Sequence, residues 1–121
     1  MKRVAICAAA QHEIKSNIWH KRFQDMLMDL LEDVQGQTGF IFGDNGVKNV
    51  LTCSDDFFDA RTISDNAIND VVGAGNYRGE QKMAQEGLNG IGYAMACFLS
   101  GHDDVIYFAG HCQESTSQRR N

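Results

Sequence analysis

The chain has 121 residues, 12 glycines and no proline. At an average proline content of about 5 %, roughly six prolines would be expected. Their absence excludes proline-rich linkers and PxxP ligands, and it leaves the turns to Gly, Asn, Asp and Ser. With 43 % hydrophobic and 22 % charged residues, the composition is that of a globular domain. We expect residues 1–111 to form one domain and residues 112–121 to form a polar C-terminal tail.

The formal net charge is −5, and its distribution says more than its size. Four of the 11 basic residues lie at the ends of the chain, at positions 2, 3, 119 and 120. The remaining seven stand against 16 acidic residues between Val4 and Gln118, a balance of −9. An acidic body disfavours binding to phosphate backbones, which Lys and Arg drive. We therefore expect no nucleic-acid partner.

The four cysteines are Cys7, Cys53, Cys97 and Cys112, and no two of them form a CxxC pair. The first three lie in apolar runs, which is typical of buried, reduced thiols. A disulfide framework is not expected in a chain that can build a core. No stretch reaches the roughly 18 apolar residues of a membrane span. We therefore expect no membrane partner and a cytoplasmic location.

The first half of the chain predicts a strand, a long helix and a hairpin. The short apolar run Lys2–Cys7 indicates a strand. The apolar residues that follow recur at helical spacing and predict a helix over about residues 10–35. Asn45-Gly46 lies between two apolar runs, and both residues tolerate positive φ. This pattern predicts a β-hairpin at residues 39–53.

The second half predicts short helical pieces, a second main helix and a last strand. Residues 54–72 are rich in Asp and indicate the helical pieces. Helical spacing returns over residues 80–100, and Gly101 suits a C-terminal cap. The stretch 91–98 also alternates large and small side chains, so a strand stays open there as an alternative. The apolar run Val105–Ala109 predicts the last strand.

This order of elements, β-α-β-β-α-β, indicates an α+β fold of the ferredoxin-like type. Such a fold is a sandwich in which two main helices pack on one face of an antiparallel sheet. The alternative is another small α/β domain with two layers. The ferredoxin-like arrangement leaves one face of the sheet open. We expect a homodimer to cover it, with four candidate contact residues: Phe40, Phe42, Val47 and Tyr107.

The segment 73–79, with the sequence GAGNYRG, is the first candidate for a ligand site. Glycines free the backbone to point amides at an anion, and a following helix adds partial positive charge. Arg78 would clamp a phosphate or carboxylate, and Tyr77 would stack on a ring. The spacing matches neither a Walker A loop nor a Rossmann fingerprint. A plain connection between two helices is the interpretation we favour.

Histidines and acids supply the remaining chemical candidates. His102 and Asp103 lie between the last helix and the last strand, where either is a candidate for acid–base work. Asp55 and Asp59 would share a helix face and suit Mg²⁺ or Ca²⁺, but acids flanking a short helix are favoured. No zinc-type spacing occurs, so we expect no metal and no cofactor, and we assign no catalytic residue. The predicted ligand-binding set is Gly73, Gly75, Asn76, Tyr77, Arg78, Gly79 and His102.

We therefore expect a small, homodimeric, non-catalytic binding or interaction domain. The alternative is a binder, or a small enzyme, acting on a nucleotide or another phosphorylated or carboxylated small molecule through Gly73–Gly79. A further signal is the set of glycines inside the second main helix, Gly87, Gly90 and Gly92. Each interior glycine costs about 1 kcal/mol relative to alanine. A neighbouring helix or a ligand must approach this helix closely.

Overall fold

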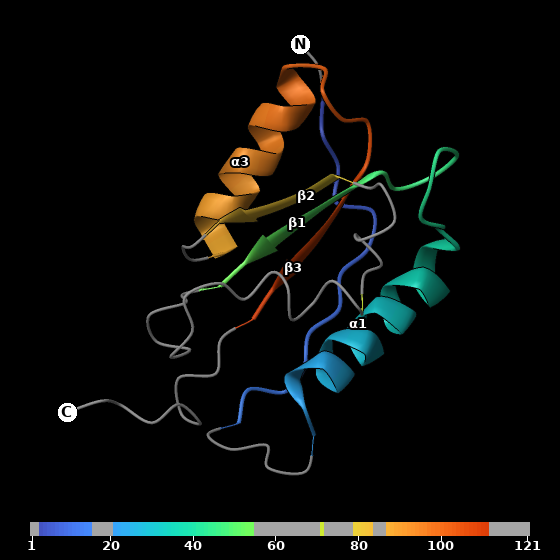
Figure 1. The fold of residues 1–121 in the computed structure, drawn as a ribbon, viewed down its shortest axis with the longest axis vertical. Helices are drawn as coiled ribbons and strands as arrows, with labels where there is room; N and C mark the ends of the chain where they lie inside the picture. The colour runs from blue at the N-terminus through green and yellow to red at the C-terminus, as the bar shows by residue number, and fades with distance from the viewer. Residues whose placement is uncertain (1–2, 16–20, 55–70, 72–78, 84–86, 112–121) are drawn as a thin grey trace, which may run out of the picture.

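The computed structural model describes residues 3–15, 21–54, 71, 79–83 and 87–111. They contain helices α1 (Phe23–Thr38) and α3 (Gly87–Leu99) and strands β1 (Asn49–Cys53), β2 (Gly79–Met83) and β3 (Ile106–Gly110). The strands form one parallel sheet in the order β2-β1-β3 (Figure 1).

Strand β1 is the centre of this sheet. Leu51 lies opposite Gln81 of β2 on one side and opposite Phe108 of β3 on the other. From Val50 to Cys53 every side chain is at most 2 % exposed. An uninterrupted buried run is typical of a central parallel strand, because helices cover both faces of such a sheet.

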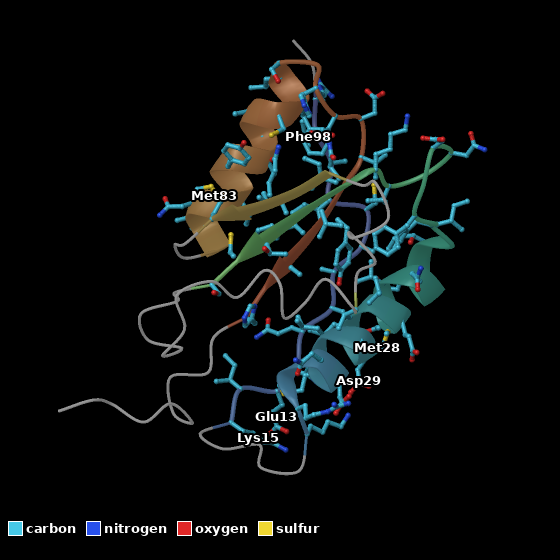
Figure 2. The ribbon with its side chains drawn as sticks, in the orientation of Figure 1. Glu13, Lys15, Met28, Asp29, Met83 and Phe98 are labelled. Atoms are coloured by element: carbon cyan, nitrogen blue, oxygen red, sulfur yellow. The ribbon has the colours of Figure 1, made fainter. Side chains whose placement is uncertain are left out.

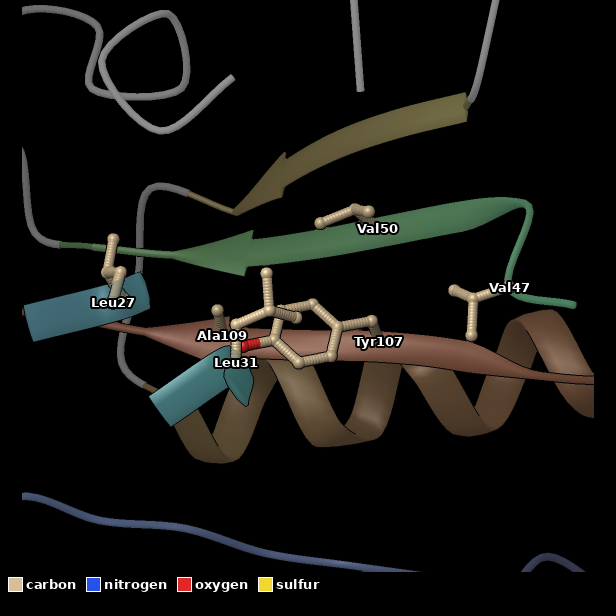
Figure 3. Close-up of a cluster of buried hydrophobic side chains, with 6 residues drawn as sticks. All are labelled: Leu27, Leu31, Val47, Val50, Tyr107 and Ala109. Carbon is tan, nitrogen blue, oxygen red and sulfur yellow. The ribbon is translucent and has the colours of Figure 1, made fainter. Parts of the chain in front are cut away.

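The two helices lie on opposite faces of the sheet, as Figure 1 shows. On the α1 face, Leu27 and Leu31 join one buried cluster with Val47, Val50, Tyr107 and Ala109 (Figure 3). Successive side chains along a strand point to opposite faces of the sheet. Cys53 of β1 and Phe108 of β3 therefore point to the face that α3 covers. The described residues therefore form three layers, helix, sheet and helix.

The mixture of helices and strands is confirmed, but the antiparallel ferredoxin-like sandwich is wrong, and so is its two-layer alternative. The predicted hairpin fails because Phe40 and Phe42 do not continue a ladder with the strand that follows. Only one bridge, from Phe42 to Val47, joins the two segments. Parallel strands are joined by crossovers rather than by tight turns.

The expected dimer face is also wrong, since those four side chains belong to the core. Phe40, Phe42 and Tyr107 form a triangle of rings with centroids 5.3–6.0 Å apart. Val47 is 2 % exposed in the cluster under α1. The side chains that sequence reasoning assigned to an open sheet face therefore pack beneath α1 and the loop before β1.

The predicted first strand and the start of the first helix are wrong as well. Residues 3–15 contain neither helix nor strand, and Ile6 is 84 % exposed. Helix α1 begins at Phe23, where the Arg22 backbone amide and guanidinium both donate to the Asp25 carboxylate. The helix ends at Thr38 and is capped by Gly39, which has φ of 69°, so a glycine does stop it, but later than predicted.

The predictions of a second main helix and of a last strand agree more closely with the structure. Residues 87–99 are helical, which settles the ambiguity at 91–98, and β3 matches the predicted last strand within a residue. Residues 79–83 form a strand and not the start of that helix. The helical pieces expected over 54–72 lie outside the described residues, except for Ser54 and Val71, and the predicted C-terminal tail lies outside them too.

Two glycines of α3 have opposite surroundings. A Cβ on Gly90 would overlap Cys53 Sγ and would lie 2.7 Å from a ring carbon of Phe108. A Cβ on Gly92 would meet no atom within 4 Å. Gly90 therefore lets α3 approach the sheet, whereas no described contact within the chain explains Gly92.

Alanine substitutions separate these roles. Gly90→Ala should lower the free energy of unfolding by about 1–3 kcal/mol, because the new methyl group overlaps the sheet. Gly92→Ala should leave it unchanged or raise it by up to about 1 kcal/mol through helix propensity. Urea unfolding in dilute solution measures both, and equal losses would contradict this packing.

Candidate functional site

The loop after α3 positions the first candidate group. Gly101 has φ of 78°, and its amide donates to the Phe98 carbonyl over 3.1 Å. The His102 amide donates to the Cys97 carbonyl, also over 3.1 Å. This pair of bonds is a Schellman motif, so the predicted glycine cap is confirmed. It turns the chain so that His102 and Asp103 stand near the amino ends of the strands.

Asp103 is the centre of a polar cluster that joins the loop after α3 to the start of β1. Its side chain is 4 % exposed, and it accepts hydrogen bonds from the Asn49 amide and from His102 Nδ1, the latter over 2.9 Å. A buried carboxylate requires such partners. The imidazole itself is 62 % exposed. Because an ionised carboxylate only accepts, Nδ1 donates in this hydrogen bond.

Gly79, the last residue of the predicted ligand segment, lies at the same end of the sheet. It lies opposite Asn49 in the ladder, and a Cβ on it would overlap Asn49 Oδ1. Any larger residue at this position would therefore displace the Asn49 side chain. Its amide donates to the Lys48 carbonyl over 3.1 Å, so this amide holds the sheet and is not presented to an anion.

Two of the seven predicted ligand-binding residues, Gly79 and His102, therefore lie at the amino ends of the strands. They are linked there through Asn49 and Asp103. The other five lie outside the described residues: Gly73, Gly75, Asn76, Tyr77 and Arg78. Sequence reasoning missed Asn49, because an Asn at the start of a strand carries no signal of its long-range partner.

The two buried cysteines, Cys53 and Cys97, are not placed to act as nucleophiles. Burial raises the pKa of the Cys53 thiol, and the Gly90 backbone acts more weakly in the opposite direction. A raised pKa keeps this group a thiol at neutral pH, so it is unreactive. Cys97 is also buried and contacts Gln81 Oε1 at 3.8 Å. Two of the three predicted core thiols are thus confirmed, whereas Cys7 is exposed.

Among the described residues, no three His, Cys, Asp or Glu side chains converge on a common point where a metal could bind. Asp55, Asp59 and Cys112 lie outside that part of the chain. Within the same part, no helix combines the length and hydrophobicity that crossing a bilayer requires.

The outer face of α3 is the second candidate. We define it as six exposed or nearly exposed positions on the side turned away from the sheet: Leu88, Ile91, Gly92, Met95, Ala96 and Leu99. Four are large apolar side chains, with exposures of 78 % for Leu88, 52 % for Ile91, 36 % for Met95 and 52 % for Leu99. No residue of α3 carries a charge. The outer face of α3 is therefore an apolar surface in contact with water.

Helix α1 has the opposite character. It carries four acidic residues and no basic one. The charged residues that Figure 2 labels, Glu13, Lys15 and Asp29, all gather around α1, whereas Met83 and Phe98 are labelled beside α3. The two helices thus differ in charge, because α1 carries four acids and α3 carries no charged residue.

Comparison with known proteins adds no relative. A scan against protein-family models, a search of curated proteins and a search of solved structures each found no match to this chain.

The polar cluster gives a stability prediction. Asp103→Ala should lower the free energy of unfolding by about 1–3 kcal/mol, because the part-buried Asn49 amide loses its acceptor. Asp104→Ala is the matched control, since Asp104 is exposed, and it should change stability by less than about 0.5 kcal/mol. Thermal or urea unfolding distinguishes them, and an equal effect of both substitutions would show that the cluster is not structural.

Proposed function

We propose that this protein is an interaction domain that binds another protein surface through the outer face of α3. The observation that carries the proposal is an uncharged helix of 13 residues whose large apolar side chains stand in water. The patch that they form is on the order of 500 Å², near the upper end for monomeric proteins. Burying such a surface is worth about 25 cal/mol per Å².

The spacing of the patch supports helix packing over ligand binding. Leu88, Gly92, Met95 and Leu99 follow one another at intervals of four, three and four residues. This is the spacing of a seam between packed helices. A seam on the convex surface of a helix suits another helix better than a small molecule, which prefers a concave site. The cytoplasmic location stays part of this proposal and rests on the cysteine pattern and on the short apolar runs of the sequence.

Polar substitutions on the outer face of α3 test the proposal. The double variant Leu88→Gln/Leu99→Gln should change the free energy of unfolding by less than about 1 kcal/mol, because both side chains already face water. It should also lose binding of anilinonaphthalene sulfonate, an apolar dye, measured by fluorescence. Val105→Gln is the matched control, because Val105 is 51 % exposed outside this face, and it should keep the dye signal.

A loss of stability of about 2–5 kcal/mol in that variant would instead indicate core positions, as in Leu→Ala substitutions in protein interiors. Such a loss, or dye binding that survives the two substitutions, would contradict the proposed function.

A second candidate function is a small-molecule site at the amino ends of β1 and β2. It is favoured by one observation, the exposed imidazole of His102 held by the buried carboxylate of Asp103 beside Gly79. A carboxylate that orients an imidazole is the arrangement of a proton-transfer group. The ligand would be an anion clamped by Arg78, and His102 would exchange a proton with it.

A thermal-shift measurement tests this candidate. Inorganic phosphate and a nucleoside monophosphate should raise the melting temperature by a few degrees, because a ligand of the folded state stabilises it. Arg78→Ala should abolish the shift and His102→Gln should reduce it. Lys15→Ala, which removes a lysine beside Glu13 (Figure 2), should keep it. No shift with either ligand, or a shift that survives Arg78→Ala, removes this candidate.

A further inference from the structure

We infer that the partner of the outer face of α3 is a second copy of this chain, packed α3 against α3 in antiparallel orientation about a two-fold axis. The inference rests on the proposed function and names its partner. Three observations support it: the charge of the chain, the order of large and small residues along the seam, and the size of the patch.

The distribution of charge over the two helices favours α3 as the surface where two copies meet. The chain has a net charge of −5, so two copies repel one another unless the contact surface is neutral. Helix α1 carries four acids, and burying them against any partner of the same charge is costly. Helix α3 carries none. Contact of α3 with α3 therefore buries no charge and brings no acidic helix into the interface.

The order of residues on α3 is self-complementary in one orientation. In an antiparallel pair centred between positions 93 and 94, residues whose numbers sum to 187 face each other. Gly92 of one copy then faces Met95 of the other, and Ala96 faces Ile91. A small residue lies opposite a large one at both places, and Leu88 faces Leu99 at the two ends. A parallel pair would set Ile91 against Ile91 and leave Gly92 facing glycine.

This orientation also explains Gly92. A glycine inside a helix is unfavourable, and nothing within 4 Å of a Cβ on Gly92 requires one. In the antiparallel pair, the space left by the absent side chain of Gly92 receives Met95 of the second copy. An isologous contact of this kind uses the same patch twice and closes at two copies.

The size of the patch sets the strength of association. Two copies would bury on the order of 1,000 Å² in total, the lower limit for a specific interface. Association of this size is expected to be weak and dependent on concentration. Two exposed apolar helices that meet in this way also remove each other's seam from water.

Sedimentation equilibrium over a range of concentrations tests the inference. The natural chain should shift from its single mass of 13.4 kDa to twice that mass as concentration rises. Gly92→Leu fills the space that receives Met95, and Ile91→Lys places like charges in the seam. Each should raise the dissociation constant at least tenfold with no loss of melting temperature at low concentration. Val105→Lys, at 51 % exposure against 52 % for Ile91, is the matched control and should dimerise normally.

Disulfide trapping tests the orientation. In a background of Cys7→Ser and Cys112→Ser, a mixture of Gly92→Cys and Met95→Cys chains should form the mixed disulfide faster than either chain pairs with itself. The two positions face each other only in the antiparallel pair. Faster pairing of Gly92→Cys with itself would overturn the antiparallel orientation.

The outcomes separate this inference from the proposed function. A chain that stays monomeric at all concentrations, but loses dye binding in Leu88→Gln/Leu99→Gln, overturns the second copy as partner and leaves the interaction surface intact. Dimers that survive both Gly92→Leu and Ile91→Lys show association through another surface and overturn the inference. Failure of the dye test removes the proposed function and this inference together.

Discussion

The contact of α3 with the sheet at Gly90 is the constraint on which the other features depend. The helix approaches Cys53 and Phe108 so closely that a single methyl group would overlap them. That contact covers one face of β1, while the cluster around Leu27 covers the other. With both faces of the central strand buried, the sheet needs no further layer. The apolar side chains that remain exposed on α3 are then not needed for the stability of the domain.

The same contact places both candidate sites. It fixes which side of α3 turns inward, so the outer face of α3 is what remains for a partner. The Schellman motif at Gly101 then ends α3 and carries the chain to Asp103. The buried carboxylate then ties this loop to Asn49 at the start of the central strand. The polar cluster orders the amino ends of the strands, and the outer face of α3 carries the stronger functional argument.

Local signals in the sequence predicted the local structure. The elements that depend on long-range strand pairing were not predicted correctly. The helix at 87–99, its glycine cap and the last strand were predictable, because spacing and a single glycine specify them. The partners of the strand at 49–53 were not, since an Asn-Gly pair favours a hairpin locally while the parallel sheet forms across crossovers. Gly79 and His102 were predicted from their chemistry. Asn49, which joins them, was not, because its partner is 54 positions away.

The central claim is that β1 is the middle strand of a parallel sheet, with α3 packed on it through Gly90. Nuclear Overhauser contacts between backbone protons test it most directly. The account predicts contacts from Leu51 to both Gln81 and Phe108, in parallel register. Cross-strand contacts from residues 49–53 to residues 40–42 in antiparallel register would contradict it, because they would restore the hairpin and remove the surface on which α3 lies.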